Sequence, residues 1–199
     1  PLVSLSKASH FEPPSSANTM SLNTGDAAPQ FSLPNANPQH GGETVSFTDA
    51  AGENGTLVLF ECNHCPYVIA SVDRINDMAA DCHTKGIGFV GINANDPVVY
   101  PNDSFEHMVK RAKGGMPYAY LHDESQEVAH AYGAKRTPEF YLFDTDHRLV
   151  YQGRMDDSPR NPTEASTREL ADAIEALLNG QKPDVDYTES IGCSVKWKA

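Results

Sequence analysis

The chain has 199 residues and carries 27 acidic residues against 15 Lys and Arg, which gives a net charge of −12 at pH 7. This length is typical of one domain, and a hydrophobic content of 39% is sufficient for a core. The negative charge argues against nucleic acid or an anionic membrane as a partner. No apolar run approaches the ~20 residues that a membrane-spanning helix needs.

The cysteines and the first residues bear on the compartment. Only one of the cysteine pairs is close in sequence, so the chain does not have the disulfide framework of a small secreted protein. The first residues lack the apolar core of a secretory signal, and we expect a cytoplasmic protein, although a leader already removed would leave no trace. Residues 1–23, rich in Ser, Pro and Asn, are expected to form a flexible extension. Met20 in this extension is a candidate native start.

The first elements expected are strands. Short apolar pieces at 31–33 and 44–47 lie on either side of Gly41-Gly42, which predicts a small β-hairpin. A loop is expected over 49–55, and a buried strand over 56–61.

A long helix is expected to follow, from about residue 63 to residue 84. Its predicted inner face has apolar residues at helical spacing, namely Val68, Ile69, Val72, Ile75 and Ala79. Pro66 fits the first turn, where its missing N–H costs little.

The rest of the chain alternates strands and helices, which predicts an α/β fold with a mixed sheet. The last helix is expected over 163–178, with Ser166 and Glu169 forming a capping box, and the tail from residue 181 is expected to be irregular. The other expected elements are a strand at 88–93, a helix at 104–112, a strand at 118–121, a helix at 125–132, and strands at 139–143 and 148–152 joined by a turn.

Two thiols stand at the predicted junction between the buried strand and the long helix, in the stretch Cys62-Asn63-His64-Cys65. A helix N-terminus carries partial positive charge and unpaired N–H groups, so it lowers the pKa of a thiol placed there. Cys62 is therefore a candidate nucleophile, and Cys65 is close enough to form a disulfide with it. The spacing in a βα unit makes redox chemistry the leading hypothesis.

This stretch resembles the active site of the thioredoxin-like superfamily. Thr137-Pro138, which precedes the strand at 139–143, is similar to the element that sets a cis-proline against the two cysteines in thioredoxins. The residues from Gly25 to Pro34 resemble the opening of the peroxiredoxin and TlpA-like branch. The resemblance covers residues 24–180 and implies a thioredoxin-like domain with a central mixed sheet flanked by helices, a hairpin before it and a tail at 181–199.

Individual residues around the cysteines have expected roles. By the resemblance, a cis bond before Pro138 would present backbone to an incoming thiol or disulfide. Arg136, close to it in the sequence, is a candidate to lie near the site and lower a cysteine pKa, with a surface arginine as the alternative. A partly protonated His64 would stabilise a thiolate and make the disulfide more oxidising. Glu61, where thioredoxins commonly have Trp, would act in the opposite direction, because a carboxylate raises the pKa of a nearby thiol.

A second alignment of the site gives a peroxidase hypothesis. Cys65-Pro66 also resembles the Cys-Pro of peroxiredoxins, in which a Thr three residues before the cysteine and a Pro four before that Thr help to form the peroxide pocket. Here those positions hold Cys62 and Val58, so peroxidase activity ranks below disulfide exchange. The third hypothesis is a metal-carrying protein, in the manner of copper chaperones of this fold, that uses Cys62, Cys65 and a histidine.

The other two cysteines lie outside the motif. Cys82, late on the predicted helix, is expected to be a buried structural thiol. Cys193 stands in a tail that looks mobile and is a candidate to reach back as a resolving cysteine, with Trp197 as an anchor. Its alternative is a packed tail with no redox role.

Together these features predict a thiol–disulfide oxidoreductase of cell redox homeostasis. The Cys62 thiolate attacks a substrate disulfide, and Cys65 resolves the mixed disulfide and leaves Cys62–Cys65 oxidised. The expected partners are protein or small-molecule disulfides and thiols, with hydroperoxides in the peroxidase alternative, and a reductant such as a thioredoxin or glutathione system. No dissociable organic cofactor is implied.

Overall fold

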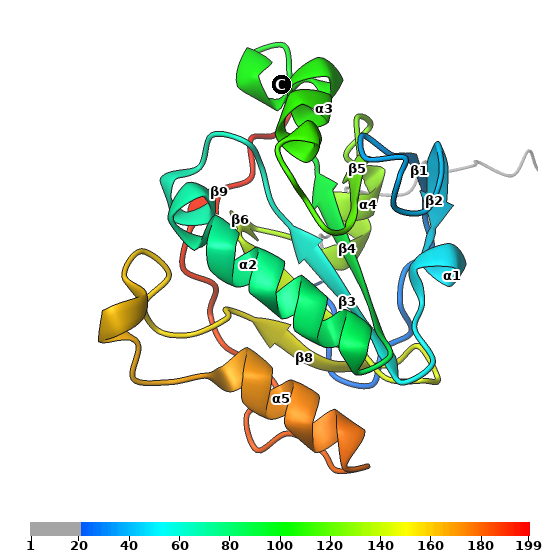
Figure 1. The fold of residues 1–199 in the computed structure, drawn as a ribbon, viewed down its shortest axis with the longest axis vertical. Coiled ribbons are helices and arrows are strands. Elements are labelled where there is room, and N and C mark those ends of the chain that lie inside the picture. The colour runs from blue at the N-terminus through cyan, green and yellow to red at the C-terminus, as the bar shows by residue number, and fades with distance from the viewer. Residues whose placement is uncertain (1–20) are drawn as a thin grey trace, which may run out of the picture.

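The structure is a computed structural model that describes residues 21–199, so Met20 and most of the predicted extension lie outside the described residues. A five-stranded mixed sheet forms its centre (Figure 1). The strand order is β5-β4-β3-β7-β8, in which β3, β4 and β5 are parallel, β7 runs antiparallel to β3, and β8 runs antiparallel to β7. The strands are β3 (Gly55–Phe60), β4 (Ile87–Asn93), β5 (Ala119–His122), β7 (Glu139–Phe143) and β8 (Leu149–Gly153).

The central strand β3 is buried along its whole length. Leu57 and Leu59 face one cluster of the core, and Val58 and Phe60 face the other. A strand covered on both faces is a continuous apolar run, which is the pattern that its sequence has. Glu61 and Cys62 follow at the end of β3, so the sheet itself positions the first thiol.

Helices cover both faces of the sheet. The helices α2 (Pro66–Thr84), α3 (Phe105–Lys113) and α5 (Glu169–Leu178) contribute buried residues to the cluster that contains Leu57. The helices α1 (Phe47–Ala50) and α4 (Glu127–Tyr132) contribute to the cluster on the other face. In Figure 1, α2 crosses the near face of the sheet, α5 lies below it and α4 lies behind. The predicted thioredoxin-like α/β architecture is therefore confirmed.

The long helix differs from the prediction in its start and its inner face. It begins at Pro66 with Cys65 as the N-cap residue, so residues 63–65 form the turn. Ile69, predicted to face inward, is 58% exposed, and the buried face includes Ser71 and Cys82. The apolar pattern alone could not exclude Ile69, because one residue after Val68 falls about 100° away on the helix.

Two further helix boundaries were wrong. The expected loop at 49–55 begins inside the short helix α1, which Ser46 and Asp49 close with a capping box. The last helix begins at Glu169 rather than at 163. Ser166 does not cap it, because the Ser166 hydroxyl and N–H both bond to Asp157. Residues Pro162–Glu164 form a separate 3-10 turn, η2.

Two small two-stranded sheets complete the fold. The predicted N-terminal hairpin is present as β1 (Ser32–Pro34) and β2 (Thr44–Ser46), which pair antiparallel. The tail is mostly irregular, as expected, but Cys193–Ser194 forms strand β9, which pairs antiparallel with β6 (Arg136–Thr137). Among the residues that the structure describes, no helix is both long and apolar enough to cross a membrane.

Candidate active site

The two cysteines of the motif both contact Thr137, near the N-terminus of α2. The hydroxyl oxygen of Thr137 lies 3.5 Å from Cys62 Sγ, and the Cys65 thiol donates to the Thr137 carbonyl oxygen at 3.3 Å. The Thr137–Pro138 peptide bond is cis, as the resemblance implied. The fold therefore joins a motif at the end of β3 to a residue about 75 positions later in the sequence.

The two thiols titrate as a unit. Their mutual hydrogen bond lowers the pKa of Cys65 to about 4 and raises the pKa of Cys62, which burial and the charge of Asp103 raise further. The thiol of one cysteine stabilises the thiolate of the other, so we expect a single negative charge on the pair at neutral pH.

Donors are available for the charge on either sulfur. The Val68 N–H and the Cys193 thiol and N–H favour a thiolate at Cys65. The Thr137 hydroxyl can donate to a thiolate at Cys62, while the Thr137 carbonyl holds a proton on Cys65. A proton can thus be exchanged within the pair, which suits a site where each sulfur must in turn attack and leave.

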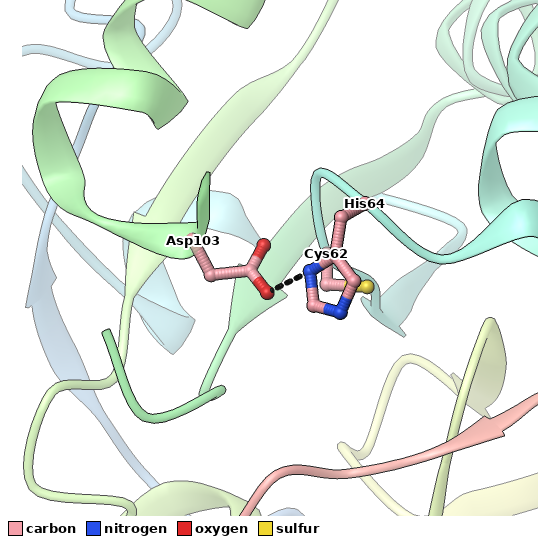
Figure 2. A group of neighbouring side chains, drawn as sticks. All are labelled: Cys62, His64 and Asp103. Carbon is pink, nitrogen blue, oxygen red and sulfur yellow. Dashed lines mark ion pairs between the residues drawn. The ribbon is translucent and has the colours of Figure 1, made fainter. Parts of the chain in front are cut away.

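His64 lies beside the buried carboxylate of Asp103, a residue outside the Cys-x-x-Cys motif. The Nδ1 atom of His64 is 2.5 Å from Oδ2 of Asp103, whose side chain is fully buried (Figure 2). This is the separation of an ion pair, without the angle of a hydrogen bond. The imidazole also stacks on the ring of Tyr100 at 5.4 Å between centroids. Together Asp103 and Tyr100 fix the histidine next to Cys62.

Asp103 is itself held by three amide donors. Its Oδ1 accepts from the Asn63 N–H at 2.7 Å and from the Asn93 side chain at 3.1 Å, and its Oδ2 accepts from the Asn95 side chain at 2.9 Å. These bonds offset part of the cost of burying a carboxylate. Asp103 was missed by sequence reasoning, because it follows the site by some 40 residues in the 3-10 turn η1 (Pro101–Asp103) and belongs to no motif.

Glu61 does not have the effect on the thiol that the sequence suggested. Its carboxylate is fully buried and pairs with Arg111 Nη2 at 2.6 Å, and it accepts from the Tyr118 hydroxyl at 2.7 Å. Arg111 therefore compensates its charge, and the carboxylate that raises the pKa of Cys62 is that of Asp103. Gly91 leaves room for this group, since a Cβ there would overlap the Glu61 carboxylate.

Of the two positions considered for Arg136, the structure has the surface one, since its side chain is exposed and donates to the Gly192 carbonyl oxygen at 3.1 Å. Its charge lowers the pKa of Cys193, not that of Cys62 or Cys65. Cys82 is fully buried on α2, as predicted, and burial raises its pKa to about 12.

The tail that carries Cys193 lies against the site. Cys193 is the register partner of Thr137 in the β6–β9 pair, and it packs against the same core cluster as Cys62 and Cys65. Trp197 stacks on His130 with 4.2 Å between ring centroids, which confirms its predicted role as an anchor.

One group of ligand-type side chains also occurs here. Atoms of Cys62, His64 and Asp103 all lie within 4.8 Å of one another, so the three could contribute ligands to a metal ion (Figure 2). The set differs from the predicted one, since Asp103 takes the place of Cys65. Both oxygens of Asp103 already accept amide hydrogen bonds, so a metal would have to compete with them.

Comparisons with known proteins identify the class. The Redoxin family model matches residues 23–170, so the chain belongs to the Redoxin family of the thioredoxin-like superfamily. An uncharacterized conserved protein from Geobacillus kaustophilus is similar at 43% identity and a TM-score of 0.82, over 88% of this chain and 93% of that one.

Two further proteins are more distant. The thioredoxin domain of a thiol-disulfide oxidoreductase from Bacteroides vulgatus shares the fold, at 20% identity and a TM-score of 0.55, over 72% of this chain and 97% of that one. A Mycobacterium tuberculosis protein described as "Putative peroxiredoxin" is 28% identical over 124 residues, which cover 62% of this chain and 71% of the relative. The chain is thus a thiol redox protein of the Redoxin family.

Proposed function

We propose that this protein is a thiol–disulfide oxidoreductase whose redox centre is the pair Cys62 and Cys65. The observation that carries the proposal is the contact of both sulfurs with one residue, Thr137, through its hydroxyl and its carbonyl group. This arrangement brings the two thiols together and lets one hold a proton while the other is a thiolate. Two coupled thiols of this kind can open a substrate disulfide and close their own.

The proposed reaction has two steps. The Cys62 thiolate, formed when the Cys62 proton passes to Cys65, attacks one sulfur of the substrate disulfide and forms a mixed disulfide, and the other substrate sulfur leaves as a thiolate. The Cys65 thiolate then attacks Cys62 Sγ, which forms the Cys62–Cys65 disulfide and releases the second substrate thiol. The substrate gains two electrons, and the protein loses two.

Single cysteine variants test this scheme with a small aromatic disulfide as substrate. In Cys65→Ser the attack on substrate can start but not finish, so a stable adduct on Cys62 is expected by mass spectrometry. Cys62→Ser is expected to form adducts much more slowly than the wild type. Cys82→Ala serves as a matched control in which the pair is intact. An adduct on Cys65 in Cys62→Ser, formed as fast as in the wild type, would assign the first attack to Cys65.

A peroxidase is the second candidate, and the burial of the site favours it. Cys62 is 1% exposed and Cys65 0%, so a small oxidant has better access than a protein disulfide while the tail is in place. The peroxiredoxin description of the M. tuberculosis relative points in the same direction. Thiol loss in fully reduced protein distinguishes the two activities. Oxidation by hydrogen peroxide that is far faster than by the model disulfide, with a sulfenic acid intermediate, would replace the oxidoreductase assignment.

A further inference from the structure

The C-terminal tail pairs with the backbone segment that lies beside the candidate redox pair. Cys193 and Ser194 pair with Thr137 and Arg136, and the same Thr137 contacts both Cys62 and Cys65. Figure 1 shows β9 next to β6, close to the start of α2. Gly192 permits this approach, because a Cβ at that position would overlap the Thr137 carbonyl group. The third cysteine is therefore seated at the site by backbone pairing.

The tail is fixed on both sides of Cys193, which differs from the mobile tail expected from the sequence. After Cys193, the Val195 N–H donates to the Lys135 carbonyl oxygen at 3.0 Å, and Gln126 bonds to the backbone of both Lys196 and Lys198. Before it, the Thr188 N–H donates to the Gln152 carbonyl at 3.0 Å. Cys193 is therefore held at one place relative to Cys65 rather than finding it by diffusion.

The three sulfurs differ in their access to solvent. Cys62 and Cys65 are almost completely buried, whereas Cys193 is partly exposed. A disulfide between Cys62 and Cys65 would lie out of reach of a protein reductant. A disulfide that includes Cys193 would place one sulfur where such a reductant can attack it.

We propose that Cys193 is a third redox cysteine, which carries the disulfide from the buried pair to the surface for reduction by an external thiol. The proposal rests on the proposed function of Cys62 and Cys65. The Cys193 thiolate attacks Cys65 Sγ in the Cys62–Cys65 disulfide, so the Cys65–Cys193 bond forms and the Cys62–Cys65 bond breaks. Cys62 leaves as a thiolate and is again ready for substrate, and the number of disulfides does not change.

An external thiol completes the cycle. Its thiolate attacks Cys193 Sγ, forms a mixed disulfide and releases Cys65 as a thiolate. The second thiol of the reductant then attacks the reductant sulfur that is bonded to Cys193. The reductant leaves with an internal disulfide, and Cys193 returns to the thiol form. Two electrons pass from the dithiol to the protein, which balances the two that the protein gave to the substrate.

The charges around Cys193 suit this order of events. In the reduced protein, burial and the neighbouring Cys65 raise the pKa of Cys193 to about 11, so its thiol is unreactive. When Cys65 enters a disulfide its charge disappears, while Lys196 and Arg136 remain to lower the pKa of Cys193. Cys193 therefore becomes a better nucleophile once there is a disulfide to attack.

Peptide mapping after oxidation tests the bond itself. Full-length wild type is oxidised with one equivalent of the small aromatic disulfide. Cys62→Ser and Cys193→Ser are oxidised with one equivalent of diamide, which links neighbouring thiols and does not need Cys62 as the attacking group, and all three proteins are then alkylated and digested. We expect Cys65–Cys193 peptides in Cys62→Ser and only Cys62–Cys65 peptides in Cys193→Ser. If Cys65 and Cys193 stay unlinked in oxidised Cys62→Ser, the inference is wrong. A wild type that does not react with the disulfide at all would instead remove the proposed function.

Turnover with reductants of different size separates the relay from a structural role. Cys193→Ser is expected to lose at least about tenfold in steady-state rate with a thioredoxin as reductant, and much less with dithiothreitol, because a small dithiol can reach a buried disulfide. Damage to the site would slow both reductants equally. Equal rates for Cys193→Ser and wild type with thioredoxin would overturn the proposal. Cys82→Ala is the control, since Cys82 lies away from the tail.

Discussion

The Nδ1 atom of His64 lies 2.5 Å from Oδ2 of the buried Asp103, and this contact ties the middle of the Cys-x-x-Cys turn to the 3-10 turn η1. The carboxylate also accepts the backbone N–H of Asn63, so it holds two successive residues between the cysteines. The geometry of the turn is thus set by a residue outside the motif.

We expect Asp103→Asn to lower the free energy of unfolding by about 1–3 kcal/mol. The asparagine NH₂ group would replace one carboxylate oxygen and would face a buried amide donor that is left without an acceptor. Chemical denaturation of the reduced protein measures this change. Asp77→Asn, on the exposed face of α2, is a suitable control, for which a change within about 0.5 kcal/mol is expected. A variant as stable as the wild type would mean that the amide donors around Asp103 do not stabilise the turn.

The same variant is expected to change the thiol chemistry in a direction that loss of stability does not explain. The charge of Asp103 raises the pKa of Cys62. Removing this charge therefore lowers the pKa of Cys62, which can be followed alone in a Cys65→Ser background by ultraviolet absorbance of the thiolate. Cys65→Ser with Asp103 intact is the reference. An unchanged or higher pKa in the double variant would show that Asp103 does not act on Cys62 by its charge.

Much of this architecture could be predicted from the sequence. The buried strand, the Cys-x-x-Cys turn and the long helix follow one another along the chain, so local patterns identify them. The residues that contact the site from other parts of the chain cannot be identified in this way. Asp103 and Arg111 act on it from η1 and α3, and only the pairing of β4 and β5 beside β3 brings those segments to the cysteines. A single sequence contains no signal for such a contact.

The tail illustrates a different difficulty. A two-residue strand is too short for any periodic pattern, so β9 was expected to be irregular, although Cys193 had been singled out by its residue type. Ile69 was assigned to the wrong side of α2, and Arg136 acts on Cys193 rather than on the pair. In each case the residue type was informative, but its direction depended on tertiary packing.

Thiolate absorbance against pH examines the coupling of the two thiols. Hydrogen bonding to Cys62 lowers the pKa of Cys65 to about 4. The ultraviolet absorbance of one thiolate in the reduced protein should therefore change little between about pH 8 and about pH 6, since this thiolate is fully formed throughout. Cys62→Ala removes the donor, so the pKa of Cys65 rises and the thiolate absorbance falls as the pH drops. A steep absorbance profile in the wild type would show that Cys65 does not hold the charge.

Cys82 offers a contrasting thiol in the same protein. Burial raises its pKa to about 12, and its side chain is fully covered on α2. We expect no alkylation of Cys82 in folded protein at neutral pH, and labelling only after denaturation, as peptide mapping can show. Cys82→Ala should cost about 1–2 kcal/mol of stability through the lost contacts and leave disulfide exchange unchanged. Loss of exchange in this variant would give Cys82 a role that its position does not suggest.

Arg111 is expected to be the most sensitive residue around the site for stability. It pairs with the fully buried Glu61 at 2.6 Å, and its other nitrogen donates to the Cys62 carbonyl oxygen at 3.1 Å. Arg111→Met leaves the Glu61 carboxylate buried without a counter-charge, so we expect a loss of about 3–5 kcal/mol. The double variant Glu61→Gln, Arg111→Met should recover part of this loss, because the uncompensated charge is gone. Denaturation of the two single variants and the double variant gives the coupling energy, and additive losses would mean that the ion pair does not hold the end of β3 in place.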